Sequence, residues 1–192
     1  MARGPHAPET SALTVLRVGV GAVLVLVLAA CASLNAGRAV GTTATAELRN
    51  AEGRVLSTAT LIQISAGVRI LVEVRGLPPG AKAVHIHEVG RCEGPAFASA
   101  GHHFNPDKRQ HGLQNPQGPH AGDLPNITIE ADGSGRLETT NDRVTLGSGS
   151  TSLFDGDGSA LVVHGSPDDF KTDPTGNSGA RVACGVIVKQ QQ

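Results

Sequence analysis

The stretch VLSTATLIQISAGVRILVEV, residues 55–74, decides the fold that this sequence predicts. Apolar and polar residues alternate on both sides of the short turn Ala66–Gly67, as they do in half-buried antiparallel strands. Two such runs joined by a tight turn predict a β-hairpin.

The same pattern recurs along most of the chain, and no run has a convincing helical period. With 25 Gly and 11 Pro among 192 residues, the composition favours many short strands joined by turns. With four Phe and no Trp or Tyr, the core must be built from Val, Leu, Ile and Ala. Strands are expected over residues 44–49, 54–65, 68–77, 82–88, 126–131, 136–140, 159–164 and 181–189. The predicted fold is an all-β, eight-stranded antiparallel Greek-key sandwich or flattened barrel.

Two long irregular segments interrupt the strands, residues 89–125 and residues 165–180. Loops longer than about 15 residues in a compact domain are usually functional or disordered. Half of the eight histidines lie in the first segment, which favours function: His102, His103, His111 and His120.

The N-terminus is predicted to be an export signal. Arg3 and Arg17 precede the uncharged run 18–30, which is too short to span a bilayer comfortably but suits the core of a signal peptide. The run ends in LAAC, which resembles a bacterial lipoprotein signal with Cys31 as the lipidated first residue. An ordinary cleaved signal, or a buried helix with an incidental cysteine, is the alternative.

The predicted organisation therefore has three parts: a signal peptide over 1–30, the lipidated Cys31 with a small, polar tether over 31–43, and one domain over 44–192. The lipid on Cys31 would hold the exported protein at the membrane of a bacterial cell envelope. A formal net charge of −1 argues against nucleic-acid binding, which needs a clustered positive surface.

Export also bears on the cysteines, because disulfides persist in oxidising compartments. Of the three cysteines, a lipidated Cys31 leaves Cys92 and Cys184 as an even pair. We expect these two to form a disulfide, with two free thiols as the alternative.

Several residues have the chemistry of metal ligands. His85 and His87 are two residues apart on a predicted strand, so their side chains leave the same face. His111, His120 and Asp123 follow in the long segment, and His164 ends a later strand. Three imidazoles with one carboxylate form a typical tetrahedral zinc set, whereas an imidazole-only set suits copper. Taken singly, His111 could be a solvated loop residue and Asp123 a turn former.

In order and spacing, these segments resemble copper/zinc superoxide dismutase. The resemblance covers about residues 44–189 and rests on the motifs HIHEVGRC, SAGHHFNP, His111, HAGDLPN, ALVVH, the pair DD at 168–169, and GNSGARVACGVI. It implies one copper and one zinc per subunit, with superoxide as the substrate. It leaves the oligomeric state open, a homodimer being one possibility.

The resemblance also implies a role for each matching residue. Copper would be held by His85, His87, His103 and His164, and zinc by His103, His111, His120 and Asp123. His103 would bridge the metals and act in catalysis, and Asp168 would hydrogen-bond a histidine of each metal. Arg181 would be the catalytic arginine beside the open copper position, where it orients the superoxide anion. His102 is assigned no ligand role.

The chain departs from the animal enzymes between His164 and Arg181. This loop is shorter, and Pro174 stands where those enzymes carry a lysine; Lys171 is a candidate substitute for attracting the anion. A metal-binding protein that stores or delivers copper or zinc, with little turnover, is the alternative function.

Overall fold

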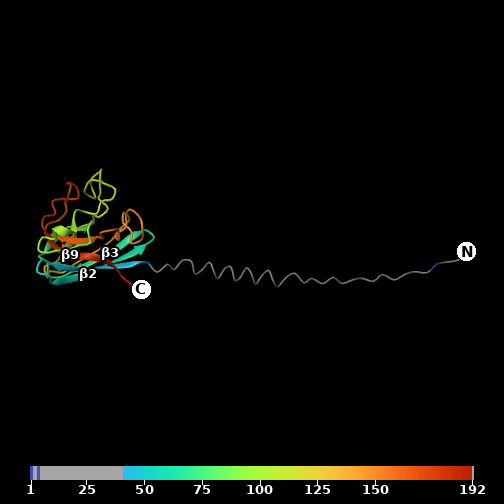
Figure 1. Ribbon diagram of the computed structural model, residues 1–192, viewed down its shortest axis with the longest axis horizontal. Coiled ribbons are helices and arrows are strands. Elements are labelled where there is room, and N and C mark those ends of the chain that lie inside the picture. Colours follow the sequence, from blue (N-terminus) through green and yellow to red (C-terminus); the bar gives the residue numbers. More distant parts are fainter. Residues whose placement is uncertain (2–3, 5–40, 192) are drawn as a thin grey trace. The chain divides into compact units, whose positions relative to one another are not determined.

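The computed structural model describes residues 1, 4 and 41–191, and within them nine strands form one antiparallel sheet (Figure 1). The strands are β1 (Thr43–Asn50), β2 (Val55–Ile64), β3 (Gly67–Val74), β4 (Gly80–Lys82), β5 (Val84–His87), β6 (Ile127–Ile129), β7 (Gly135–Asn141), β8 (Ala160–His164) and β9 (Arg181–Lys189). The predicted signal peptide, Cys31 and the tether up to residue 40 lie outside the described residues.

All eight expected strands are present, but the fourth, expected over 82–88, is divided: Lys82 ends the short strand β4, which begins at Gly80, and residues 84–87 form β5, so the prediction of eight strands is corrected to nine. Ala83 separates β4, which pairs with β6, from β5, which pairs with β8. The backbone N–H of Ala83 donates to Ser166, and its carbonyl accepts from His164. Neighbouring residues of one run therefore take partners from different parts of the sheet.

This division nearly closes the sheet into a barrel. The strand order is β4-β6-β7-β3-β2-β1-β9-β8-β5, so the two strands at its ends are neighbours in the chain. The all-β antiparallel prediction is confirmed. A single turn of 3-10 helix, Ala98–Ala100, accompanies the strands, and in the part that the structure describes no helix is long and apolar enough to cross a membrane.

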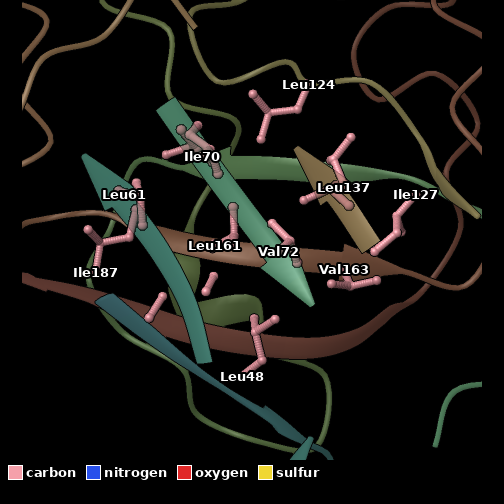
Figure 2. Close-up of a cluster of buried hydrophobic side chains, with 14 of the residues drawn as sticks. Leu48, Leu61, Ile70, Val72, Leu124, Ile127, Leu137, Leu161, Val163 and Ile187 are labelled. Atoms are coloured by element: carbon pink, nitrogen blue, oxygen red, sulfur yellow. The ribbon is translucent and has the colours of Figure 1, made fainter. Parts of the chain in front are cut away.

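The barrel interior is aliphatic, as the composition predicts. On β3, buried side chains alternate with more exposed ones, and the buried set points inward. Figure 2 shows side chains from β1, β2, β3, β6, β7, β8 and β9, and from the loop before β6, meeting in this core, among them Leu48, Leu61, Ile70, Ile127, Leu137, Leu161 and Ile187, with Leu124 from the loop.

Strands β5 and β8 differ from the rest because they are buried on both faces. Val84 and Ile86 of β5 belong to the core, so His85 and His87 point out of the barrel. These two histidines are nevertheless buried, because the long loop after β5 covers them. This covered outer face is where the functional site is built.

The start of the domain differs from the prediction by one residue. Thr43, expected as the last residue of the tether, is the first residue of β1 and pairs with Ile62 of β2.

Candidate metal centre

The long loop is fixed to the outer side of β5 by backbone hydrogen bonds. Phe104 donates to the carbonyl of Ile86 at 2.8 Å, and Ile86 donates to the carbonyl of Gly122 at 2.9 Å. These bonds pair His103 with His87 and Asp123 with His85. The approach needs a glycine at 122, because a Cβ there would lie 2.2 Å from the carbonyl oxygen of Ile86.

One cluster consists of the four predicted copper ligands. Each offers one ring nitrogen, and these nitrogens all lie within 4.8 Å of one another: His85, His87, His103 and His164. The Nε2 atoms of His87 and His164 face each other at 3.4 Å. Their Nδ1 atoms contact protein groups, Gly101 O at 3.0 Å for His87, and Gly179 O at 3.3 Å and Ser178 Oγ at 3.1 Å for His164. Two imidazole lone pairs are therefore directed at one point, as a cation requires.

A second cluster forms around Asp123. Its Oδ1 lies 3.0 Å from Nδ1 of His103 and 3.0 Å from Nδ1 of His111. The group that meets the 4.8 Å limit consists of His85, His103, His111 and Asp123, without the predicted ligand His120. His120 lies close by, since its Nδ1 is 3.3 Å from Nδ1 of His103 and 3.5 Å from Oδ1 of Asp123.

His103 belongs to both clusters. Its Nδ1 faces Asp123, and its Nε2 is buried without a hydrogen-bond partner. Nδ1 of His85 is buried and unpartnered in the same way. Buried polar groups are normally hydrogen-bonded. These two nitrogens have no protein partner, which is the arrangement expected of atoms that bind a metal ion. The donor sets fit metal ions, and the two clusters have His85 and His103 in common.

Asp168 holds one histidine of each cluster. Its Oδ2 lies 2.9 Å from Nε2 of His85 and its Oδ1 3.0 Å from Nε2 of His111. All three side chains are fully buried. The carboxylate thereby selects the tautomer in which the other nitrogen of each ring is free to bind a metal.

The environment sets the protonation of these rings. Burial, with repulsion from neighbouring imidazoles and Arg181, lowers the pKa of His87 to about 2 and that of His164 to about 3. Both are therefore neutral, which is the form that binds a metal. Burial also acts to lower the pKa of His111, but contacts with Asp123 and Asp168 outweigh it and raise the pKa to about 9. Metal binding at His111 must therefore displace a proton.

Arg181 is the first residue of β9 and is paired with His164 of β8. Its Nη1 donates to the carbonyl of Phe97 at 2.5 Å and its Nη2 to the carbonyl of Gly101 at 2.6 Å. Gly101 O also accepts from Nδ1 of His87, so one carbonyl oxygen is hydrogen-bonded both to the guanidinium and to a histidine of the four-histidine cluster. Arg181 as a whole is half-buried.

The predicted disulfide is confirmed. Cys92 and Cys184 are bonded, with a Cα–Cα distance of 5.6 Å, across 92 residues of sequence. The bond attaches the start of the long loop to β9, close to the carbonyls that hold Arg181.

Three contacts at the site were not predicted from the sequence. The side chain of Asn126 donates to the carbonyl of Asp168 and accepts from its N–H, each at 2.9 Å. The hydroxyl of Ser178 is fully buried against His164, and Oδ1 of Asp173 accepts from the N–H of His111 at 2.6 Å. Asn126 ends the motif HAGDLPN and Ser178 lies in the motif GNSGARVACGVI, so the sequence offered a signal for both of them, whereas Asp173 lies outside the quoted motifs. The two neighbours with no assigned ligand role, His102 and Lys171, are exposed.

Known proteins are similar to this chain in sequence. Residues 55–187 match the family model of copper/zinc superoxide dismutase (SODC). The chain is 52% identical over 144 residues to superoxide dismutase (Cu-Zn) 1 of Aquifex aeolicus, a match that covers 74% of this chain and 85% of that protein. It is 45% identical over 147 residues to the superoxide dismutase (Cu-Zn) of Caulobacter vibrioides, covering 75% and 84% of the two chains.

A solved structure agrees with the sequence match. The crystal structure of a superoxide dismutase-like protein from Bacillus subtilis superimposes with a TM-score of 0.72 at 38% identity, covering 75% of this chain and 97% of that one. The sequence match, the barrel and the two histidine clusters agree, and the chain belongs to the copper/zinc superoxide dismutase family.

Proposed function

We propose that the chain dismutes superoxide to dioxygen and hydrogen peroxide with two metals bridged by His103, at the cell envelope. Membership of the family establishes that the chain is an oxidoreductase that acts on superoxide, with copper and zinc as its cofactors. The bridge and the location are the proposal. The proposed ligands are His85, His87, His103 and His164 for copper, and His103, His111, His120 and Asp123 for zinc.

One observation supports the bridge more than any other. Nδ1 of His103 lies 3.0 Å from Asp123, in the second cluster. Nε2 of the same ring is buried and has no hydrogen-bond partner. The residue is also a member of the four-histidine cluster. An imidazole that serves two cations must lose both ring protons, and this ring offers both nitrogens.

Within the four-histidine cluster, the residues that hold copper and the residue that moves a proton have different roles. Copper, when bound, supplies the electron that superoxide gains at one encounter and accepts the one that it loses at the next. The chain holds His87 and His164 neutral and aligned through the carbonyls of Gly101 and Gly179. Nε2 of His103 can take up a proton and pass it to the reduced oxygen, because the ring stays anchored through Nδ1.

The decisive experiment compares the purified protein, reloaded with copper and zinc, with a His87→Ala variant. We expect the wild type to consume superoxide far faster, because the variant lacks a nitrogen of the four-histidine cluster. If the two proteins have equal rates while the wild type binds both metals, the chain stores or delivers metal and is not an efficient dismutase.

Arg181 is proposed to attract and orient superoxide. Replacing it with alanine should lower kcat/KM by about 10-fold, because electrostatic steering by a local positive charge raises association rates by one to three orders of magnitude. The rate should also become less sensitive to ionic strength. Arg181→Lys is the matched control, since it keeps the charge and loses the planar fork; a full rate in Arg181→Ala would refute this role.

The proposed location rests on the disulfide and on the sequence before residue 41. The Cys92–Cys184 bond fits an exported protein, because disulfides persist outside the reducing cytosol. We propose that Cys31 carries the lipid anchor. A labelled fatty acid should be incorporated into the full chain and not into its Cys31→Ala variant; labelling of both would refute the anchor.

A further inference from the structure

Asp173 lies in the short loop between β8 and β9 and contacts two of the proposed zinc ligands. Its Oδ1 accepts the backbone N–H of His111 at 2.6 Å, and the same oxygen lies 3.7 Å from Nε2 of His120. The family motifs in this sequence do not include this aspartate. It stands directly before Pro174, at the place where the chain departs from the animal enzymes.

We propose that Asp173 is a positioning residue of the zinc site, fixing the backbone of His111 and stabilising the outer nitrogen of His120. The inference rests on the zinc site proposed above.

The other ligand histidines show why His120 needs such a partner. The ring nitrogen that would face away from a bound metal contacts Asp168 in His85 and His111, Gly101 O in His87, and Gly179 O in His164. In His120 that nitrogen is Nε2, and among the described residues Asp173 is the one carboxylate within 4.0 Å of it. A cation bound at Nδ1 withdraws electron density from the ring and strengthens the attraction between Nε2–H and a carboxylate.

The side chain of Asp173 is 47% exposed, but the backbone of its loop is joined to the long loop nearby. The carbonyl of Phe170 accepts from the N–H of Gln114 at 2.9 Å. Gly112 lies directly against Phe170, since a Cβ at 112 would be 2.2 Å from that carbonyl oxygen. The short loop therefore lies along the zinc-side part of the long loop, and Asp173 follows Phe170 by three residues.

A second glycine allows the short loop to pack closely against Asp168 and His111. Gly176 has a φ of 63°, and a Cβ there would lie 1.9 Å from Oδ1 of Asp168 and 2.6 Å from Nε2 of His111. The loop thus brings two carboxylates to the proposed zinc ligands. Asp168 contacts the ring of His111, and Asp173 contacts the backbone of His111 and lies near the ring of His120.

The test compares Asp173→Ala and Asp173→Asn with the wild type, using zinc alone. Zinc affinity is measured by competition with a chromogenic chelator, and the geometry by the visible spectrum after Co²⁺ is bound in place of zinc. We expect Asp173→Ala to lower zinc affinity by about 10- to 100-fold, the usual effect of losing an outer partner of a metal ligand. Asp173→Asn should lose less zinc affinity than Asp173→Ala. Its amide oxygen can still accept the backbone N–H of His111, although the negative charge beside His120 is gone. Both Co²⁺ spectra should change.

Two controls separate a metal-positioning role from a general one. Asp107→Asn removes an exposed charge from the long loop and should bind zinc as the wild type does. Thermal unfolding of the metal-free proteins reports purely structural damage. If the alanine and asparagine variants bind zinc like the wild type, or lose affinity only in proportion to the stability of the metal-free protein, the inference is wrong. If His111→Ala binds zinc as tightly as the wild type, the proposed zinc site itself is wrong.

Discussion

Replacing His103 with alanine is expected to abolish dismutation and to weaken the binding of both metals at once. The ring is the one side chain with a nitrogen in each proposed ligand set, and its unpartnered Nε2 is buried. Loss of an outer partner alone weakens a metal site by about 10- to 100-fold, so loss of a shared ligand should weaken each site by at least about 100-fold. Copper and zinc contents after dialysis at limiting metal would measure both effects in one sample.

The neighbouring residue provides the matched control. His102 is exposed, and its contacts with Glu88 are made by backbone atoms, which an alanine keeps. His102→Ala should therefore retain both metals and full activity. A His103→Ala protein that keeps either metal at wild-type affinity would contradict the bridge.

Replacing both Cys92 and Cys184 with serine is expected to lower the free energy of unfolding by about 4 to 5 kcal/mol. The bond closes a loop of 92 residues, and closing a loop of that length removes about this much chain entropy from the unfolded state. This is a large share of the stability of an ordinary domain, which is about 5 to 15 kcal/mol. Urea unfolding of the metal-free proteins would measure the difference.

The same variant should also lose activity per bound copper. Arg181 is held by the carbonyls of Phe97 and Gly101, and both lie in the segment that begins at Cys92. Reduced wild-type protein should behave like the double variant in both measurements. If the variant unfolds at the same urea concentration as the oxidised wild type, the bond does not stabilise the fold.

The strands could be predicted because their burial alternates along the sequence. The alternation in residues 68–74 appears in the structure as one buried face of β3. The division of residues 82–88 at Ala83 could not be predicted, because it depends on hydrogen bonds to Ser166 and His164, which are far away in the sequence. A local pattern contains no information about such distant partners.

The candidate site shows the same limit. The motifs pointed to histidines that the structure brings together from β5, β8 and the long loop. The groups that orient them are less visible in a sequence, because several are main-chain carbonyls such as that of Gly101. Asp173 acts through the backbone of His111, 62 residues away, so neither its type nor its spacing indicated a role.

The way in which Asp168 divides its two oxygens has a consequence for how the metals load. One oxygen orients His85 and the other orients His111, so one rigid carboxylate group connects the two proposed ligand sets. An ion that fixes either imidazole also restricts this carboxylate, and with it the second imidazole. The two binding equilibria are then linked, and thermodynamics requires that zinc change the copper affinity by the same factor by which copper changes the zinc affinity. The two ions should therefore not load as independent occupants: the affinity for one should depend on whether the other is bound.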